Sequence, residues 1–254
     1  MIEASANKSP LFTIITVCQN AGKLLERTIR SVLSQTFDSF EYLIKDGLSS
    51  DGSLRALSRI EKIRLISKPD TGIYDAMNQA IEYSMGNFVC FMNTGDTFYS
   101  SETLTRVAQL IHQHPEKSVY LGHAFIDGKP KIHPPRFSSA FLYDGHICHQ
   151  AVFVSRGLYS SEKGFDLRYR LLADRDFFMR VFWVKRVPYQ VIPEFVCNYD
   201  PTGVTSQEKY HELKNQEYRE IQRKYFGLKH RIIIWLYLHS LVRAKSLLKA
   251  HLFR

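Results

Sequence analysis

Residues 11–45, LFTIITVCQNAGKLLERTIRSVLSQTFDSFEYLIK, decide the fold. The apolar and β-branched run at 11–18 predicts a buried strand, and residues 40–45 predict a second one. Between them, residues 21–36 repeat leucine, isoleucine and valine at the spacing of one helix face. Two strands joined by a helix form a crossover in which the strands run parallel, so this stretch predicts an α/β fold.

The alternation of strands and helices continues to about residue 128. Further strands are predicted at 63–67, 87–92 and 119–122, and helices near Ser53 and at 73–84 and 101–114. From about residue 129 the alternation weakens, and the predicted elements are a strand at 146–154, a helix at 171–183, one or two returning strands at 187–199 and helices at 207–225 and 231–254. We therefore expect a mostly parallel sheet flanked by helices, with an amphipathic helical tail at the C-terminus.

Composition places the chain among folded, water-soluble proteins, with 254 residues, 44% hydrophobic and 23% charged. The cysteines at 18, 90, 148 and 197 form no C-x-x-C pair, which argues against a zinc site or a disulfide framework and indicates a reducing compartment. Residues 1–10 are polar and lack the apolar core of a secretory signal. These features predict a cytoplasmic location.

The net charge of +9 is concentrated at the C-terminus. Residues 223–254 hold eight of the 34 basic residues and no acidic one, which leaves 26 basic against 25 acidic residues in the rest of the chain. A nucleic-acid-binding domain carries its basic residues on a folded docking face. The net charge is the only feature that favours nucleic acid, and we predict no nucleic-acid partner.

Polar side chains follow each of the first four predicted strands. They are Gln19 and Asn20 after the first strand, Asp46 and Asp51 after the second, Asp70 after the third and Asp96 after the fourth. Ligands of open parallel sheets bind beyond the carboxyl ends of the strands. The sequence therefore predicts a polar, acidic ligand site at one edge of the sheet.

Several of these residues have a chemical and a purely structural interpretation. Asp96, beside Gly95, suits a hard cation such as Mg²⁺ or Mn²⁺, or it belongs to a turn that caps the next helix. Asp46 could accept hydrogen bonds from a base or ribose, or close a turn. Asp75 and Asn78 share a helix face near an N-terminus, where anions are stabilised, or they form a solvated first turn.

The second half of the chain offers candidates for acid–base chemistry. Asp174 and Asp176 are two apart on a predicted helix and point to different sides, so one could be a general base while the other caps the helix or pairs with Arg180. His149 could hydrogen-bond a substrate hydroxyl or phosphate, or be structural. The chain contains no P-loop, dinucleotide fingerprint, H-E-x-x-H pair or G-x-S-x-G elbow, which disfavours those enzyme classes.

Seven segments in consistent order resemble one known family. They are ITVCQN, SVLSQTF, EYLIKDGLSSDGS, KPDTGIYDAMNQAI, GNFVCFMNTGD, HQAVF and LLADRDFFMR, within residues 11–180. Together they are similar to family 2 glycosyltransferases, which have the GT-A fold, and most similar to the bacterial branch that builds exopolysaccharide, capsule or O-antigen. The resemblance implies a nucleotide-sugar donor, a divalent cation (Mg²⁺ or Mn²⁺) that bridges its diphosphate, and direct displacement with inversion at the anomeric carbon.

The resemblance also implies roles for individual residues. Asp46 is expected to meet the nucleotide base with Gln19 and Asn20 near it, Asp75 and Asn78 to line the donor pocket, and Asp96 to bind the metal as the final acid of a D-x-D-like motif. Asn93, Thr94 and Gly95 replace the earlier acids of that motif. Asp174 matches the base of the family's E-D pair, although Ala173 replaces the glutamate, and Asp176 is the alternative. His149 and Arg180 are second-choice or acceptor-binding candidates.

The expected organisation has four parts. A polar segment, 1–10, precedes a nucleotide-sugar-binding half at 11–128, an acceptor-binding half at 129–226 and a basic amphipathic tail at 227–254. The longest uncharged run of the tail, 232–242, has 11 residues, against the ~20 needed to span a bilayer. We expect residues 231–254 to lie on an anionic membrane surface or, alternatively, to pack on the domain.

A membrane contact would suit a lipid-linked saccharide acceptor and a peripheral position on the cytoplasmic face. The missing acids before Asp96 and the missing glutamate before Asp174 leave a second hypothesis open. In that hypothesis the chain is a non-catalytic nucleotide-sugar or membrane-binding protein on the same fold.

Overall fold

The structure is a computed structural model that describes residues 9–55, 57, 60–203 and 208–237. The strands are β1 Phe12–Cys18, β2 Phe40–Asp46, β3 Ile63–Ser67, β4 Phe88–Phe91, β5 Thr97–Phe98, β6 Val119–Ile126, β7 Lys129–Lys131, β8 Val152–Ser155 and β9 Tyr189–Tyr199. The helices are α1 Gly22–Leu33, α2 Ile73–Tyr83, α3 Thr103–Gln113, α4 Ser139–Asp144, α5 Arg156–Ser161, α6 Ala173–Phe178 and α7 His211–Tyr225. Short helical turns lie at His149–Ala151 (η2), Met179–Val184 (η3) and Glu208–Tyr210 (η5).

The described strands form one sheet in the order β3-β2-β1-β4-β8-β6-β9-β5, with β7 paired to β6. The strands β3, β2, β1 and β4 run parallel, as the first half of the sequence predicts. Their carboxyl ends consequently meet at one edge. Beyond β4 the sheet is mixed, because β8 is antiparallel to both β4 and β6 while β9 is parallel to β6.

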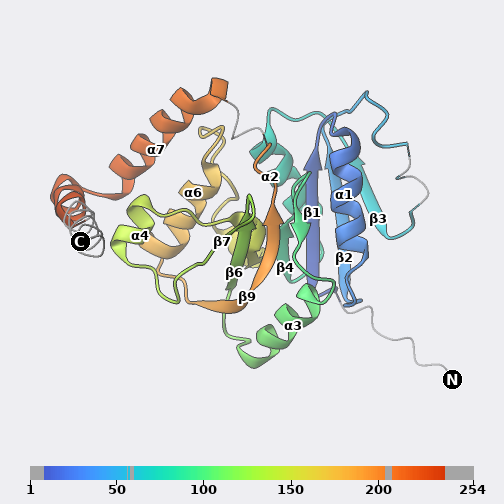
Figure 1. The fold of residues 1–254 in the computed structure, drawn as a ribbon, viewed down its shortest axis with the longest axis horizontal. Helices are drawn as coiled ribbons and strands as arrows, with labels where there is room; N and C mark the ends of the chain where they lie inside the picture. Colours follow the sequence, from blue (N-terminus) through green and yellow to red (C-terminus); the bar gives the residue numbers. More distant parts are fainter. Residues whose placement is uncertain (1–8, 56, 58–59, 204–207, 238–254) are drawn as a thin grey trace, which may run out of the picture.

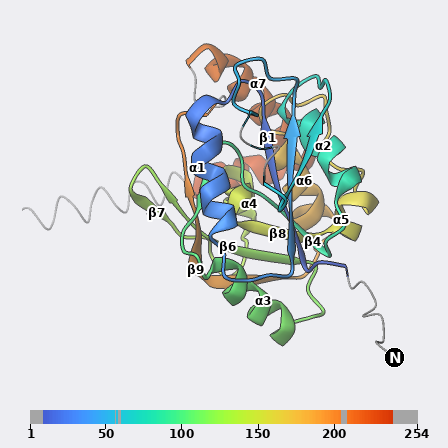
Figure 2. The same cartoon turned by 90° about the vertical axis from the view of Figure 1, so that its right-hand side faces the viewer.

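Helices cover both faces of the sheet, and β1 is buried on both (Figure 1). Ile14 packs into a core with Leu25 and Ile29 of α1, whereas Ile15 packs into a second core with Met77 of α2. Figure 2 shows α1 and α2 on opposite sides of β1. A strand buried on both faces has a continuous apolar sequence, which explains the unbroken run at 11–18.

The second half differs in detail from the sequence prediction. The segment predicted as a strand at 146–154 is irregular at 146–148 and continues with the η2 turn, and only its last part enters β8. The predicted helix at 171–183 is α6 followed by a π-helical turn, η3. The helix expected near Ser53 falls in a region of turns, part of which lies outside the described residues.

The C-terminal part is helical as far as it is described. The helix α7 is followed by helical residues 228–237, in which Ile234 is buried in the core that also contains Phe178 of α6. The predicted polar segment and the predicted tail lie mostly in residues 1–8 and 238–254, outside the described residues. Within the part of the chain that is described, none of the helices has the length and apolar character to cross a membrane.

Candidate active site

A cleft of about 500 Å³ opens at the carboxyl ends of β1, β3 and β4. The turn η2, the start of α6 and the end of β9 complete its walls. Its polar lining includes Gln19, Asn20, Asp70, Asn93, Thr94, Asp96, His149, Gln150, Asp174 and Asp200. The cleft therefore lies where the parallel strands predict a ligand, and both halves of the chain contribute to it.

Asp96 is fixed on the wall of this cleft. Asp96 is only 2% exposed. The Asp200 backbone N–H donates to its Oδ1 over 2.7 Å, and Gln150 Nε2 donates to its Oδ2 over 2.9 Å. Burial raises the pKa of Asp96 to about 7 despite these two hydrogen bonds. A bound cation would favour the ionised form of the same group.

The donor set around Asp96 fits a weakly held, hard cation. Each carboxylate oxygen accepts one hydrogen bond and keeps a lone pair, and the Asp200 carboxylate also lines the cleft. Among the described residues, no group of three or more His, Cys, Asp or Glu side chains is arranged to hold a metal. Mg²⁺ needs only one or two carboxylates when substrate phosphates and water supply the other ligands.

Asp174 and His149 form a hydrogen-bonded pair in the cleft. Asp174 Oδ2 lies 2.9 Å from His149 Nδ1, and Oδ1 accepts hydrogen bonds from Tyr74 OH and the Arg175 backbone N–H, both over 2.8 Å. Burial raises the pKa of Asp174, but the hydrogen bonds from His149 and Tyr74 and the nearby imidazoles outweigh it and lower the pKa to about 2. His149 Nε2 lies 3.0 Å from Asn93 Nδ2.

Gln19 and Asn20 reach the cleft, whereas Asp46 lies beneath it. The Asp46 carboxylate is fully buried and accepts hydrogen bonds from the Ser49 backbone N–H and from Ser67 Oγ at 2.7 Å. Gln19 Nε2 donates to the Gly47 carbonyl over 2.9 Å. Asp46 is not among the described residues that line the cleft. Its oxygens accept hydrogen bonds that hold the loop after β2.

The side chains of Asp75 and Asn78 also form hydrogen bonds with backbone groups, and neither residue is among the described residues that line the cleft. Asp75 Oδ2 accepts a hydrogen bond from the Thr71 backbone N–H over 2.8 Å, which ties the loop before α2 to the first turn of the helix. Asn78 makes two hydrogen bonds with the backbone of Phe165, at 2.9 and 2.8 Å. The structure thus places both side chains outside the pocket in which the sequence predicts them.

Asp176 and Arg180 form a separate buried network. Asp176 is fully buried and contacts Arg180 Nε at 3.1 Å, Lys224 Nζ at 2.7 Å and Tyr225 OH at 2.8 Å. Arg180 also donates to the Gly164 carbonyl over 2.6 Å. Neither residue is among the described residues that line the cleft, so the two aspartates of α6 face different surroundings, as their spacing predicts.

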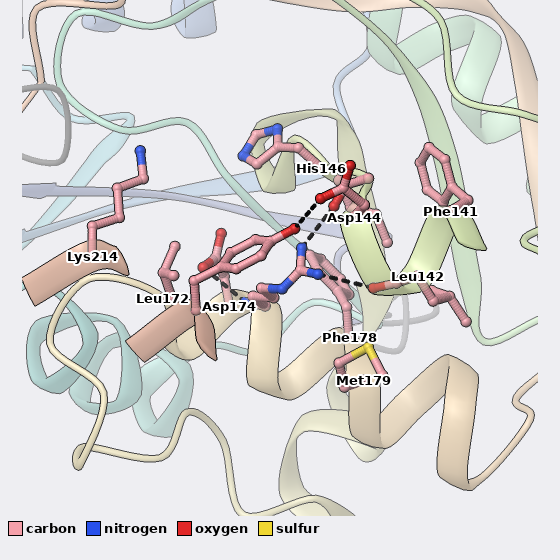
Figure 3. Close-up of a pocket in the computed structure, with 13 residues that line it drawn as sticks. Phe141, Leu142, Asp144, His146, Leu172, Asp174, Phe178, Met179 and Lys214 are labelled. Atoms are coloured by element: carbon pink, nitrogen blue, oxygen red, sulfur yellow. Dashed lines mark hydrogen bonds between the residues drawn. The ribbon is translucent and has the colours of Figure 1, made fainter. Parts of the chain in front are cut away.

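A second cavity, of about 100 Å³, adjoins the cleft beside Asp174 (Figure 3). The two spaces share His146, Leu172, Asp174 and Lys214. The apolar wall of the second cavity consists of Phe141, Leu142, Ile147, Phe178 and Met179. The Arg175 guanidinium, 4.2 Å from the centre of the Tyr218 ring, donates to the Gly145 carbonyl over 2.7 Å and fixes the loop after α4.

Several lining residues escaped the sequence prediction as site residues. Tyr74 and Gln150 lie in segments that carry the family resemblance but were not named as site residues, and Asp200 and Lys214 lie outside all of those segments. Asp200 follows β9 directly, and the strand-end rule, applied to the predicted strand that ends at residue 199, could have identified it. Asp70 lies after β3. Its Oδ2 forms an ion pair with Lys45 Nζ at 2.8 Å, and the Lys45 side chain is fully buried.

The parallel strand ends and the acidic cleft define an α/β protein that binds its ligand at the edge of the sheet. Residues 13–185 match the family described as Glycosyl transferase family 2. The chain therefore belongs to glycosyltransferase family 2, as its resemblance predicted. The match contains Asp96, His149 and Asp174 but ends before Asp200.

A sequence relative supports this assignment, and two solved structures share the fold. The PGL/p-HBAD biosynthesis glycosyltransferase of Mycobacterium bovis (strain BCG / Pasteur 1173P2) is 31% identical over 205 residues, which cover 77% of this chain and 78% of the relative. The crystal structure of S. aureus TarS 1-349 in complex with UDP-GlcNAc has a TM-score of 0.66 and 18% identity, covering 78% of this chain and 60% of TarS 1-349.

The mannosyltransferase PcManGT from Pyrobaculum calidifontis, in complex with GDP-Man and Mn²⁺, has a TM-score of 0.62 and 16% identity and covers 83% of this chain and 61% of its own. The chain spans about three fifths of the length of these two solved structures. Their similarity confirms the predicted GT-A-type α/β fold.

Proposed function

We propose that the protein transfers one sugar from a nucleotide-sugar to a hydroxyl group of a saccharide acceptor, with inversion at the anomeric carbon. The observation that carries this proposal is that Asp96 and the Asp174–His149 pair line one cleft. A site for the leaving diphosphate and a group that can remove a proton are thus available to one bound substrate. Membership of the family and the fold shared with two sugar-nucleotide complexes support it.

The donor would extend from the end of β1 to Asp96. Gln19 and Asn20 lie at the end nearest β1, above the loop that Asp46 holds, and suit the nucleoside. Asp96 suits the diphosphate with Mg²⁺ or Mn²⁺, and Asp200 lies beside it. A cation held there would stabilise the negative charge of the departing nucleoside diphosphate.

The acceptor would enter from the side of the second cavity. This cavity opens at Asp174, so an acceptor seated there brings a hydroxyl to the Asp174–His149 pair while the donor occupies the larger cleft. An acceptor hydroxyl on the side opposite the leaving diphosphate gives in-line displacement and inversion. Holding the two substrates in this arrangement supplies a large part of the rate enhancement.

The acceptor is proposed to be a lipid-linked saccharide of cell-surface polysaccharide synthesis. The helical residues 228–237 expose six large apolar side chains, each more than half exposed: Leu228, Ile232, Ile233, Trp235, Leu236 and Tyr237. Basic residues flank them in the sequence. Such a surface suits the interface of an anionic membrane and a peripheral position on its cytoplasmic face.

A scan of UDP-, GDP- and dTDP-sugars for protection against thermal unfolding tests the proposal, with Mn²⁺ or Mg²⁺ and with chelator. A ligand that binds the folded state raises the apparent stability. We expect protection by one nucleotide class that is lost with chelator, together with slow release of the nucleoside diphosphate. Protection without turnover in the presence of saccharide acceptors would favour the non-catalytic nucleotide-sugar-binding alternative, and no protection would contradict both.

A further inference from the structure

We propose that the second cavity is a subsite for a methyl group that the acceptor sugar carries close to its reacting hydroxyl. The inference rests on the proposed transferase function and deepens it, because it names the chemical class of the acceptor. Two kinds of sugar offer such a methyl group, a deoxy sugar and an N-acetylated amino sugar. The walls, the size and the position of the cavity each support the proposal.

The walls of the second cavity are apolar and belong to the core of the protein. They come from α4, from the segment before η2 and from the junction of α6 with η3. Four of the wall residues are 9% exposed or less: Leu142, Ile147, Phe178 and Met179. The fifth, Phe141, stacks on Phe137 with 5.0 Å between the ring centres. Side chains packed in this way hold the shape of the cavity.

Backbone oxygens beside these walls are engaged by another side chain. The Arg175 guanidinium donates to the Leu142 carbonyl over 3.0 Å and to the Gly145 carbonyl over 2.7 Å. A sugar hydroxyl between the walls would therefore give up its hydrogen bonds to water and find few replacements, which costs free energy. A methyl group makes no hydrogen bonds and gains from burial. The walls thus favour a methyl group over a hydroxyl.

The volume of the cavity limits the group that fits inside. It is about 100 Å³, whereas an apolar cavity of about 150 Å³ holds a benzene molecule. A methyl or acetyl group fits within the smaller volume, but an aromatic ring or a lipid chain does not. The lipid that we propose for the acceptor must therefore lie elsewhere.

The position of the cavity brings such a group close to the candidate base. Asp174 lines both the cavity and the cleft, as do His146 and Lys214. In Figure 3, Lys214 lies on one side of Asp174 and the apolar walls lie on the other. A sugar whose methyl group enters the cavity keeps its ring at this border, so that a hydroxyl near the methyl-bearing carbon reaches Asp174.

Xenon tests the cavity without any sugar, because xenon binds in apolar cavities. Nuclear magnetic resonance of the full chain, labelled with ¹³C at the methyl groups of its five methionines, reports the binding. We expect xenon to shift the resonance that disappears in Met179→Leu. The internal control is Met77, which is buried in the same core and is not among the described residues that line either space. A Met179 resonance that moves no more than that of Met77 would overturn the proposal.

Pairs of acceptors test the specificity with the donor found by thermal protection. Each pair joins the same octyl aglycone to a parent hexose and to its 6-deoxy or 2-acetamido derivative, and nucleoside diphosphate release gives kcat/KM. One methylene group in an apolar pocket changes kcat/KM by about 10–200-fold. We expect the methyl-bearing member of one series to exceed its parent by such a factor, and that series identifies the source of the methyl group.

The same kinetics separate failure of this inference from failure of the proposed function. Equal kcat/KM values within every pair, or a preference for the parent hexoses, would overturn the methyl subsite while the transferase function stands. Absence of nucleoside diphosphate release with every acceptor would contradict both, even if xenon shifts the Met179 resonance.

A variant of the wall tests whether the cavity sets this preference. Met179→Ala enlarges the cavity, so the best substituent should become one carbon longer, ethyl instead of methyl or propanamido instead of acetamido, by about tenfold or more. Thermal protection by the donor should stay unchanged. Met77→Ala is the matched control and should keep the preference of the unmodified protein.

Ile147→Val keeps the test available if Met179→Ala does not fold. It removes a single methyl group from the wall and should shift the preference in the same direction by a smaller factor. Wall variants that keep the preference of the Met77→Ala control would overturn the proposal.

Discussion

Asp96 illustrates how one residue serves the fold and the proposed ligand. Its carboxylate is held by Gln150 and by the Asp200 backbone, yet it lines the cleft. We expect Asp96→Ala to abolish Mn²⁺-dependent thermal protection by the donor, because Asp96 is the carboxylate that we assign to the metal and the diphosphate. Asp75→Asn is the control, since Asp75 is outside the described lining and should leave the protection intact. Retained Mn²⁺ dependence in Asp96→Ala would place the metal elsewhere.

His133 is a second residue whose environment has a measurable consequence. It is 1% exposed, its Nδ1 lies 2.6 Å from the Gly122 carbonyl, and its Nε2 accepts from the Cys148 backbone N–H over 3.2 Å. This pattern needs a neutral ring with its hydrogen on Nδ1. Burial lowers the pKa of His133 to about 4, against its ordinary value of 6.5.

The pH dependence of stability follows from this shift. Between pH 6.5 and about 4 the unfolded chain takes up a proton at His133 that the folded chain refuses, so the free energy of unfolding falls as the pH falls. The full shift corresponds to about 3 kcal/mol. Urea unfolding at a series of pH values measures this effect. The free energy of unfolding should change less steeply with pH over this range for His133→Asn than for the unmodified protein. Identical slopes would mean that His133 is protonated in the folded state.

At the scale of elements, α7 positions the start of α6. Glu217 of α7 is 4% exposed, and its carboxylate accepts hydrogen bonds from the backbone N–H groups of Arg170, Leu171 and Leu172 at 2.7 to 3.0 Å. These groups precede α6, which carries Asp174. A side chain from a distant helix therefore satisfies donors that the local sequence leaves unpaired.

Replacement of this carboxylate should affect stability and catalysis together. We expect Glu217→Ala to lower the free energy of unfolding by about 2–3 kcal/mol, because three backbone donors, two of them buried, lose a charged acceptor. Its kcat should also fall, since Asp174 shifts with α6. Glu217→Gln keeps one acceptor oxygen and should lose less of both. Denaturant unfolding measures the free energy of unfolding of the unmodified protein and of both variants. Equal values for all three would show that water replaces the carboxylate.

The elements also show what the sequence could predict. The strands β1 to β4 and the helices between them were predictable, because apolar runs buried on both faces and amphipathic helices have strong local patterns. The strand β8 has only four residues, and η3 winds as a π-helix. Such features follow from tertiary packing, which local periodicity does not record.

The aspartates of α6 show the same limit for the site. Residue type and spacing do not distinguish Asp174 from Asp176, and only the family resemblance favoured Asp174. The partners that separate them, His149 and the pair Lys224 and Tyr225, lie far along the chain. Gln19, Asn20, Asp96, His149 and Asp174 were predictable from strand ends and motifs. Asp46, Asp75 and Asn78 lie outside the described lining because local hydrogen bonds use their oxygens.

For the whole molecule, the two halves share one sheet and one cleft. The N-terminal half supplies Asn93 and Asp96, and the second half supplies His149, Asp174 and Asp200. The join is the antiparallel pairing of β4 with β8, which sets η2 beside the end of β4. The proposed transfer needs donor and acceptor in one space, and this join brings residues of both halves to one cleft.

The exposed apolar surface of residues 228–237 gives the last prediction, which concerns how the molecule meets a membrane. Ile233 is 64% exposed and Leu236 56% exposed, whereas Ile234 between them is buried, so the two side chains can be changed without opening the core. Burying one such side chain contributes roughly 1.5–3 kcal/mol. Replacing both by glutamate should therefore weaken binding to anionic phospholipid vesicles about tenfold or more.

Vesicle sedimentation at low and high salt measures this effect. We expect the unmodified protein to bind anionic vesicles and to be released by salt, because the basic residues near the exposed surface are screened. Leu167→Glu is the matched control, since Leu167 is 49% exposed and lies in a different part of the chain. If Ile233→Glu/Leu236→Glu binds as tightly as this control, the helix is part of the folded domain, and the acceptor must reach the second cavity without help from a membrane-bound tail.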